Sequence, residues 1–401
     1  MIIKLPEYIL TCLKQLNSNG YECYVVGGAI RDSLLGRHIS DYDLATNATP
    51  LDIKNVFTKE AIYDNGIKHG TITVIIKSHP IEITTYRIDG EYFDGRHPES
   101  VYYTQSIYED CKRRDFTINA ICYHPKSGFL DFFDGMDDLN NKVIRCIDDP
   151  DKRFNEDALR IMRALRFSAQ LEFSIEQNTK ESIFKNKDLL HKISIERITD
   201  EFLKIIKCDN CSKIIQEYFE IFSLFIKELK TLNDYQIEKT VSFLDNHIYS
   251  TSTKIATLLY YLKDDALSIM EYLKLPNTTK RKVMYLLEYE NVDLTDRLTL
   301  KKTLSVSEEY FNDLLEFTKI IDPSLNIKEI RTEANYILKN NEPIRLKQLH
   351  ISGNDVVALG FKGHDISIIL NDVLNQIMDG SVLNIKEDMI NYINETYKKE
   401  A

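Results

Sequence analysis

The sequence predicts an α+β protein, with a small α/β head followed by an all-helical remainder. Two observations carry this prediction. Short runs rich in apolar and β-branched residues, which favour strands, lie in the first part of the chain. Glycine, which interrupts helices, occurs ten times up to Gly135, four times from Gly353 onward, and not at all in the 217 positions between. A stretch with so few breakers favours helices joined by short polar loops.

The head contains three predicted strands and two predicted helices. The first strand ends at the pair Gly27-Gly28, and residues 78–80 form a tight connection between the other two. Apolar and β-branched runs predict the strands at residues 24–26, 71–76 and 81–86. Helical patterns between them predict the helices at residues 29–35 and 50–57.

Composition excludes two classes of protein. The 401 residues are 28% charged and 43% hydrophobic, which is typical of neither a disordered nor a membrane-embedded chain. No apolar run approaches 18 residues, and the first 20 residues read as an ordinary amphipathic start rather than a signal peptide. The seven cysteines are scattered and odd in number. They favour reduced thiols in a cytoplasmic protein over a disulfide framework.

The formal net charge of −11 argues against a surface coated in basic residues. The charge is unevenly distributed, however. Residues 1–150 carry 16 basic and 22 acidic side chains, and residues 351–401 carry 4 and 8. Residues 151–200 carry 10 and 9, and form the only positive block of that size. The sequence therefore predicts a local basic track just after the head.

The strongest local signal is the glycine pair between the first strand and the first helix, followed by Arg31. Gly27-Gly28 lets backbone N–H groups approach phosphate oxygens, and the helix N-terminus adds partial positive charge. Arg31 adds a formal charge one turn into the helix. The chain contains neither the GxxxxGK[ST] nor the GxGxxG fingerprint. The segment is therefore interpreted as a phosphate-binding turn of another kind.

Three carboxylates are candidates for metal binding. Asp41 and Asp43 alternate along a predicted strand, which places both on one face, and such a pair suits one or two Mg²⁺ ions on a nucleoside triphosphate. An isolated pair of this kind is more often a solvated acidic turn, but the preceding glycine turn and Arg31 favour the metal site. Glu82, between the apolar Ile81 and Ile83, either completes the site, by binding metal or helping to deprotonate an attacking hydroxyl, or forms a structural ion pair.

Two basic segments lie farther along. The cations Lys112, Arg113 and Arg114 form either a solvated helix start or a set of donors for triphosphate oxygens. In the helical pattern at residues 156–167, four charged residues recur every third position and form one row. An ion pair between Asp157 and Arg160, three positions apart, would stabilise the helix and would explain these two residues without a functional role. Three arginines in one row suggest nucleotide binding instead. The row consists of Asp157, Arg160, Arg163 and Arg166.

Together these segments resemble the class II tRNA nucleotidyltransferases, which comprise the CCA-adding enzymes and the bacterial poly(A) polymerases. The similarity covers roughly residues 20–200, and residues 351–357 with 384–388 resemble the tail of the short bacterial CCA-adding enzymes. The matching strings, in the family's order and spacing, are VVGGAIRDSLLGR, DYDLATNATP, CKRRDFTINAI and RFNEDALRIMRALRF.

The resemblance implies a polymerase-β-like nucleotidyltransferase head and helical neck, body and tail domains. The expected bounds are 1–135 for the head, 136–200 for the neck with the base template, 201–300 for the body and 301–401 for the tRNA-binding tail.

The resemblance also implies roles for site residues. Asp41 and Asp43 are expected to bind Mg²⁺. Gly28, Arg31 and Arg114 are expected to hold the phosphates and sugar of the incoming nucleotide.

The resemblance further implies that Asp157 and Arg160 form a protein template for the base, with Arg163 and Arg166 in support. Cytosine and adenine each present an amino donor beside a ring-nitrogen acceptor, which suits a carboxylate and a guanidinium. Uracil and guanine present the opposite order. One Asp–Arg pair therefore accepts CTP and ATP and excludes UTP and GTP.

The expected reaction is attack of the tRNA 3′-hydroxyl on the α-phosphate of CTP or ATP, with the acceptor arm and 3′ end of tRNA as the partner. The alternative is a poly(A) polymerase, or a relative that adds only CC or only A. The segment at residues 89–98 resembles the loop that complete CCA-adding enzymes keep. The global charge favours salt-sensitive binding to one RNA shape. Monomer and homodimer both stay open, and no membrane partner is expected.

Other readings carry less weight. Intact Asp41, Asp43 and Arg114 disfavour an inactive RNA-binding relative. A small-molecule nucleotidyltransferase does not need the 156–167 helix or more than 200 further helical residues. The dipeptide His364-Asp365 is interpreted as a helix start rather than part of a phosphohydrolase site.

Overall fold

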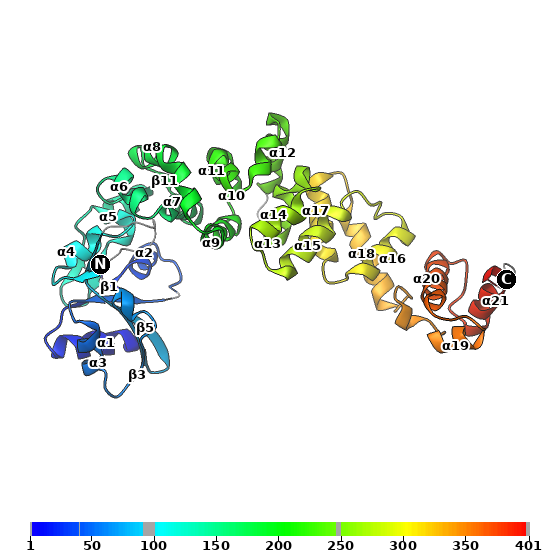
Figure 1. Ribbon diagram of the computed structural model, residues 1–401, viewed down its shortest axis with the longest axis horizontal. Coiled ribbons are helices and arrows are strands. Elements are labelled where there is room, and N and C mark those ends of the chain that lie inside the picture. Colours follow the sequence, from blue (N-terminus) through cyan, green and yellow to red (C-terminus); the bar gives the residue numbers. More distant parts are fainter. Residues whose placement is uncertain (1, 40, 91–100, 246–249, 398–401) are drawn as a thin grey trace. The chain divides into compact units, whose positions relative to one another are not determined.

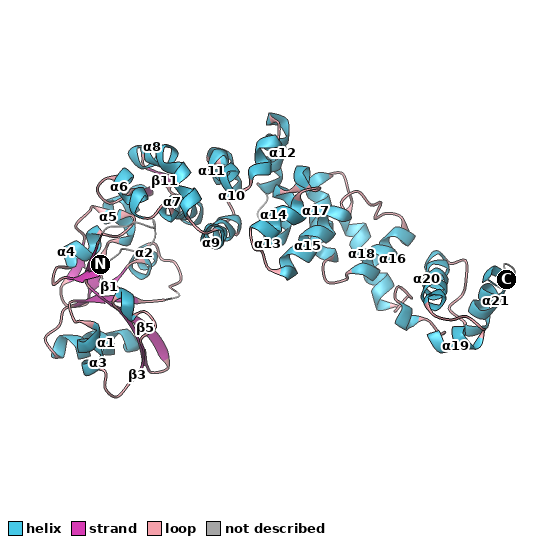
Figure 2. Cartoon of the chain, in the orientation of Figure 1, coloured by secondary structure: helices cyan, strands magenta, loops and turns pink. Residues whose placement is uncertain are grey.

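The computed structural model describes residues 2–39, 41–90, 101–245 and 250–397. The chain forms two compact units, Met1–Thr231 and Leu232–Ala401. Among the described residues, the seven-stranded sheet lies in the first unit and the second unit is helical, as Figures 1 and 2 show. This arrangement confirms the predicted α+β class. The finer division at residues 135, 200 and 300 stays a prediction.

A seven-stranded mixed sheet forms the centre of the first unit, in the order β3-β4-β5-β2-β1-β8-β9. β2 and β5 pair in parallel, and the other neighbouring strands are antiparallel. Buried side chains such as Val26, Ala45 and Cys122 pack into one core on this sheet. The strands are β1 (Cys23–Val26), β2 (Asp43–Thr46), β3 (Ala61–Tyr63), β4 (Thr71–Ile76), β5 (His79–Thr85), β8 (Cys122–His124) and β9 (Gly128–Leu130).

The three predicted strands are confirmed, but the predicted turn between β4 and β5 is wrong in its position. Ile76 pairs with His79, so the connection is the two-residue turn Lys77-Ser78, and His79 and Pro80 already belong to β5. Both turn residues have positive φ values, 50° and 67°. A two-residue turn of this hand matches the twist of the strands, which is why the hairpin closes there despite the absence of glycine.

Short helices and a two-stranded ribbon complete the head. Both helices predicted there, at residues 29–35 and 50–57, are present within one residue of their expected bounds. The helices are α1 (Glu7–Ser18), α2 (Gly28–Leu34), α3 (Pro50–Val56), α4 (Ile107–Lys112) and α5 (Gly135–Asn141), with 3₁₀ turns η1 (Ile67–His69) and η2 (Thr117–Asn119). The ribbon pairs β6 (Arg87–Asp89) with β7 (Val101–Tyr103). The loop predicted to resemble that of complete CCA-adding enzymes lies, from residue 91 onward, outside the described residues.

The rest of the first unit is almost entirely helical. Its central helix, α7, is buried at ten of its positions and packs on α9. The helices are α6 (Pro150–Glu156), α7 (Leu159–Leu171), α8 (Gln177–Asn186), α9 (Ile195–Ile206), α10 (Cys211–Glu217) and α11 (Phe219–Phe225), with η3 (Lys187–Lys192) and η4 (Lys227–Thr231). The short strands β10 (Val143–Ile144) and β11 (Ser174–Ile175) pair in parallel beside α7.

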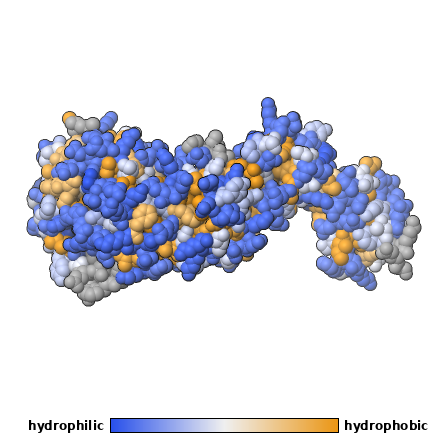
Figure 3. All heavy atoms as spheres, turned by 90° about the horizontal axis from the view of Figure 1, so that it is seen from above, coloured by the Kyte–Doolittle hydropathy of each residue, from blue (hydrophilic) through white to orange (hydrophobic). Residues whose placement is uncertain are grey.

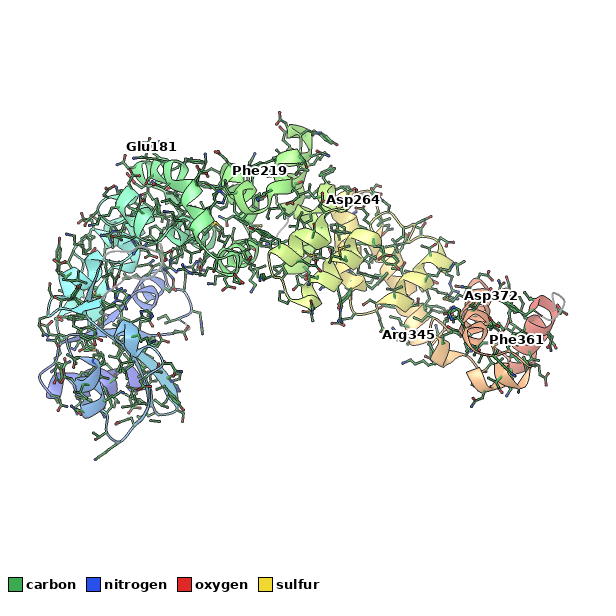
Figure 4. The ribbon with its side chains drawn as sticks, viewed as in Figure 1. Glu181, Phe219, Asp264, Arg345, Phe361 and Asp372 are labelled. Carbon is green, nitrogen blue, oxygen red and sulfur yellow. The ribbon has the colours of Figure 1, made fainter. Side chains whose placement is uncertain are left out.

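The second unit is helical throughout its described residues. Its C-terminal helices are joined through Asp372, whose Oδ2 accepts hydrogen bonds from the hydroxyls of Tyr392 (2.7 Å) and Tyr397 (2.9 Å), and the Tyr397 ring contacts Phe361 edge-on. Figure 4 labels Asp372 and Phe361 in this part of the chain. The helices are α12 (Asp234–Leu244), α13 (Thr251–Leu258), α14 (Ala266–Tyr272), α15 (Asn277–Glu288), α16 (Arg297–Val306), α17 (Phe311–Ile321), α18 (Ile327–Lys339), α19 (Gly353–Ala358), α20 (His364–Asp379) and α21 (Lys386–Tyr397), with η5 (Tyr260–Leu262) and η6 (Leu346–Gln348).

The structure tests the predicted helix start at His364-Asp365 and shows the character of the surface. His364 is the first residue of α20, which confirms the predicted helix start. On the face drawn in Figure 3, hydrophilic residues predominate and hydrophobic residues form scattered patches. Within the described parts of the chain, no helix has the length and apolar character needed to cross a bilayer.

Candidate active site

A pocket of about 460 Å³ lies within the first unit, between α7 and the ends of the central strands β1 and β2. It collects eight of the ten predicted site residues, and Asp41 and Glu82 lie next to Asp43 in sequence and in strand register. The walls are polar and carry both signs of charge. The lining residues are Gly27, Gly28, Arg31, Asp43, Arg113, Arg114, Asp115, Asn119, Asp157, Arg160, Arg163, Arg166 and Phe167.

The glycine turn lies at the floor of this pocket. Gly27 has a φ of +72°, a conformation that side chains other than glycine rarely adopt. A Cβ at this position would lie 3.5 Å from Nη1 of Arg114 and 3.9 Å from Oδ2 of Asp43. The turn therefore brings bare backbone next to the guanidinium and carboxylate that line the pocket. α2 begins directly afterwards, at Gly28.

Arg31 is buried and held in one orientation by two partners. Its Nε and Nη2 each donate to the Asp32 carboxylate at 2.9 Å, and its Nη1 donates to Oδ1 of Asn119 at 2.7 Å. Asn119 in turn donates to the Asp115 carboxylate at 3.0 Å. These bonds fix a cation at the pocket wall, where it is preorganised to meet an anion.

Two of the candidate metal carboxylates lie on paired parallel strands, and Asp41, predicted on the same strand as Asp43, lies just before that strand begins. In the part of the chain that the structure describes, no three His, Cys, Asp or Glu side chains are grouped closely enough to hold a metal ion by themselves. Asp43 opens β2 and pairs in register with Glu82 of β5, and Asp41 lies two residues before Asp43. Glu82 is exposed while its neighbours Ile81 and Ile83 are buried, so its side chain points away from theirs as predicted. Surrounding protein atoms raise the pKa of Asp43, the charges of Glu82 and Asp41 raise it further, and Arg114 opposes them. The cluster is thus a place of excess negative charge.

Asp110 holds two of the arginines that line the pocket. Its buried carboxylate accepts from Nη2 of Arg113 at 2.8 Å and from Nη2 of Arg114 at 3.2 Å. Burial by itself raises the pKa of Asp110, but the two guanidinium charges outweigh it, and the pKa lies below its ordinary value. Arg113 and Arg114 are therefore pocket-lining side chains rather than a solvated helix start. Lys112 lies apart from them, 3.9 Å from Asp148.

The predicted helix over residues 156–167 is broken at its second position, which corrects the sequence interpretation. α6 ends at Glu156, Asp157 is extended with φ −144° and ψ 104°, and α7 begins at Leu159. The Leu159 N–H donates to Oδ1 of Asp157 at 3.0 Å. Asp157 thus lies beside the start of the helix instead of within it, and it borders the pocket.

The three arginines of the row each have an acidic partner. Arg160 pairs with Glu156 at 2.7 Å and donates to the carbonyl oxygen of Arg113 at 3.1 Å, and Arg166 pairs with Glu201 of α9 at 2.6 Å. These contacts connect α7 with the head on one side and with α9 on the other.

Arg163 pairs with Asp115, the buried carboxylate that also holds Asn119. Nε of Arg163 donates to Oδ2 of Asp115 at 2.8 Å. Burial raises the pKa of Asp115, but the charge of Arg163 and the hydrogen bonds from Asn119 and Arg163 outweigh this effect, and the pKa lies well below its ordinary value. Asp115 is therefore ionised at neutral pH and links the row on α7 to the segment that holds Arg31.

A single aromatic ring lies among three of these cations. The guanidinium carbons of Arg31, Arg163 and Arg166 lie 4.9, 5.4 and 4.1 Å from the ring centre of Phe167. The face of an aromatic ring attracts cations and offers a flat surface against which guanidinium groups pack. Phe167 thus supports a concentration of positive charge that repulsion alone would disperse.

Sequence reasoning missed several residues that orient the predicted ones. Asp110, Asp115, Asn119 and Phe167 all lie within or beside the basic segments already singled out. Acidic and amide residues next to a run of arginines signal pairing of this kind, but do not show which arginine each one holds. The partners on α9, Arg197 and Glu201, carry no such local signal.

Comparison with protein-family models covers most of the chain. Residues 23–145 match the model described as "Poly A polymerase head domain". Residues 172–229 match the model described as "Probable RNA and SrmB-binding site of polymerase A". Residues 246–393 match a model for domain 2 of tRNA nucleotidyltransferases.

Curated relatives match over nearly the whole chain. The CCA-adding enzyme of Ligilactobacillus salivarius is 34% identical over 400 residues, which cover 95% of this chain and 94% of the relative. That of Streptococcus suis is 32% identical over 98% of this chain and 97% of the relative. That of Lactobacillus johnsonii is 47% identical over 222 residues, and this alignment spans about half of each chain, 55% in both cases.

Solved structures show the same fold. The CCA-adding enzyme of Bacillus stearothermophilus in complex with CTP has a TM-score of 0.79 and 27% identity, with 98% of this chain and 99% of that chain covered. The Thermotoga maritima CCA-adding enzyme complexed with tRNA has a TM-score of 0.67 at 20% identity over 98% of this chain and 96% of that one. At that identity the second match shows the fold alone.

Proposed function

This chain belongs to the CCA-adding enzyme family, and from that premise we propose that it adds C, C and A to the 3′ end of tRNA without a nucleic-acid template. The substrates are CTP and ATP, and pyrophosphate is released. The observation that carries the proposal is the pocket that joins the carboxylates of β2 to the arginine row of α7. Relatives aligned over almost their full length are CCA-adding enzymes, which favours this activity over poly(A) synthesis.

The triphosphate is bound by the glycine turn and the two arginines beside it. Gly28 offers a backbone N–H without a side chain in the way, and Arg31 and Arg114 line the same pocket. Arg31 is held by Asp32 and Asn119, and Arg114 by Asp110. Guanidinium groups held in this way meet phosphate oxygens without first losing conformational freedom.

The carboxylates fit a Mg²⁺ site. Asp41 and Asp43 are the proposed ligands, and Glu82 lies close enough in register to assist. Desolvation raises the pKa of Asp43, and the charges of Glu82 and Asp41 raise it further, a repulsion that a divalent cation would relieve. Mg²⁺ commonly takes one or two protein carboxylates and completes its shell with water and substrate phosphates. When bound, Mg²⁺ supplies Lewis-acid activation of the hydroxyl and neutralises phosphate charge.

Base selection falls to Asp157 and Arg160, both on the pocket wall. Asp157 accepts from the exocyclic amine of cytosine or adenine, and Arg160 donates to the adjacent ring nitrogen. Arg160 is anchored by Glu156, so its guanidinium has a defined position. Arg163 and Arg166 lie on successive turns of α7 and support the nucleotide through positive charge and through their packing on Phe167.

The chemical step is in-line attack of the tRNA 3′-hydroxyl oxygen on the α-phosphorus. The hydroxyl proton passes to the Glu82 carboxylate, a new P–O bond forms to the tRNA, the bond from the α-phosphorus to the bridging oxygen of the β-phosphate breaks, and pyrophosphate leaves with the electron pair. Asp41, Asp43 and Glu82 border the attacking side. Arg31 and Arg114 stabilise the charge that develops on the leaving group.

Incorporation of each labelled nucleoside triphosphate into a tRNA transcript that lacks CCA tests the proposal. CTP alone should be incorporated efficiently, and ATP only after two cytidines have been added. UTP and GTP should be incorporated poorly at every stage. Comparable incorporation of all four nucleotides would defeat the assignment of Asp157 and Arg160 as the base template.

A further inference from the structure

The Asp157 carboxylate is held by a residue forty positions away. Nη2 of Arg197 donates to Oδ2 of Asp157 at 2.9 Å, and Nη1 lies 3.5 Å from Oδ1. The Leu159 N–H donates to Oδ1 as well. Only 17% of the Asp157 side chain and 22% of the Arg197 side chain are exposed. The pair is thus partly buried. Oδ1 of Asp157 has two protein donors, whereas Oδ2 has one and keeps a lone pair for a further donor.

The local backbone holds only one oxygen of Asp157, because the Leu159 N–H donates to Oδ1 alone. The residue lies in extended conformation at the junction of α6 and α7. A carboxylate held at one oxygen still rotates about that contact, and only some orientations place the other oxygen in the plane of a base. A guanidinium that contacts both oxygens selects one rotation of the carboxylate plane.

The donor comes from an element that also supports the far end of the row. Arg197 lies in the first turn of α9, and Glu201, one helical turn later on the same face, pairs with Arg166 of α7 at 2.6 Å. α9 therefore contacts the nucleotide-binding row at Asp157 and at Arg166. Its packing against α7 sets the position of both contacts.

We propose that Arg197 is a positioning residue for nucleotide selection, which holds the Asp157 carboxylate in the orientation that accepts an amino group and rejects a carbonyl. This inference rests on the proposed role of Asp157 as part of the base template. Arg197 acts through Asp157 and does not touch the base. Arginine is required because its fork contacts both oxygens, whereas lysine offers a single point charge.

The test compares Arg197→Ala and Arg197→Lys with the unmodified chain. The measured quantity is the ratio of kcat/KM for CTP to that for UTP in single-nucleotide addition to a tRNA transcript that lacks CCA. Arg197→Ala is expected to lower this ratio by about tenfold or more, mainly through a higher KM for CTP and a higher rate with UTP. The ratio for Arg197→Lys is expected to lie between that of Arg197→Ala and that of the unmodified chain. Lys207→Ala, an exposed cation at the end of the same helix, is the matched control and should leave the ratio unchanged.

A double-mutant cycle with Asp157→Ala separates this inference from the proposed function. If Arg197 acts through Asp157, Arg197→Ala changes the ratio in the unmodified chain but not in the Asp157→Ala background. If Asp157→Ala loosens base choice and Arg197→Ala leaves it intact, the positioning role is refuted and the base template stands. If Asp157→Ala itself leaves base choice intact, the template fails and the positioning role fails with it.

Thermal unfolding distinguishes the positioning role of Arg197 from a merely structural one. An Arg197→Ala variant that loses activity equally with all four nucleotides, together with a lowered Tm, would overturn the inference. A variant with a near-normal Tm and a lowered CTP-to-UTP ratio supports it.

Discussion

Asp43 and Glu82 lie opposite each other in the one parallel strand pair of the seven-stranded sheet, at the position where β2 begins. The pairing brings together two carboxylates that are 39 positions apart in the sequence. It also contributes to the raised pKa of Asp43, because the charge of Glu82 is the largest cause after desolvation by the surrounding protein atoms. The sheet thus builds a negative site that is unfavourable until a cation neutralises it.

Asp43→Asn should abolish nucleotidyl transfer while leaving the fold intact. We expect kcat to fall by a factor on the order of 10³ or more, since the amide is a poor Mg²⁺ ligand. Because the folded-state pKa of Asp43 is raised, its charged form destabilises the fold above that pKa, and the Tm of the variant at pH 7 should equal or exceed that of the unmodified chain. Steady-state kinetics and calorimetry provide the check, and near-normal turnover would contradict the assignment.

Magnesium should stabilise the protein through the same carboxylates. We expect the Tm of the unmodified chain to rise when Mg²⁺ is added, because the ion binds the folded state in preference to the unfolded chain. Asp43→Asn should reduce or remove this rise. Differential scanning fluorimetry with and without MgCl₂ measures it, and Asp264→Asn in the second unit controls for the loss of an exposed carboxylate. An equal rise in both variants would place the metal elsewhere.

Asp157→Ala should loosen base choice more than it slows chemistry. The substitution removes the acceptor for the amino group of cytosine and adenine but leaves the phosphate-binding residues in place. We expect UTP incorporation to rise relative to CTP by about tenfold or more. An equal loss of rate with all four nucleotides and unchanged selectivity would defeat the template.

Asp115 should make stability depend on pH in the acid range. Its lowered pKa means that its ionised form stabilises the fold fully above the unfolded-state value of about 3.9, and that this contribution is lost as the pH falls below that value. Asp115→Asn should cost about 2 kcal/mol at pH 7, less than a fully buried pair because a third of the Arg163 side chain is exposed. The difference in the free energy of unfolding between the unmodified chain and Asp115→Asn should be constant from about pH 5 to about pH 8, because Asp115 is ionised throughout that range. The difference should become smaller below about pH 4. A difference that widens in acid would contradict the ionised pair.

Local patterns were sufficient to predict part of the head, although β3, β8 and β9 of its sheet were missed. The strands at residues 24–26, 71–76 and 81–86 follow from apolar and β-branched runs, and the helices from periodicity. Two errors have physical causes. The turn at Lys77-Ser78 uses positive φ values without glycine, and the helix break at Asp157 follows from a carboxylate that accepts from the Leu159 N–H instead of continuing the helix. Neither feature produces a change in hydrophobic pattern.

The residues of the candidate site were more predictable than their partners. Arg31, Arg114 and the row on α7 stand in recognisable motifs. Their orientation depends on pairs such as Arg163 with Asp115 and Asp157 with Arg197, which join residues 48 and 40 positions apart. Such pairs depend on how helices pack, and no local pattern in a single sequence records that packing.

The central claim is tested most directly by extension of three tRNA transcripts that end before CCA, after the first C, and after CC. Each is incubated with CTP, ATP and Mg²⁺, and the products are sequenced at their 3′ ends. The predicted result is completion of every transcript to CCA followed by a stop. Continued addition of A would show a poly(A) polymerase, and a stop at CC would show a partial enzyme; either result would contradict the account.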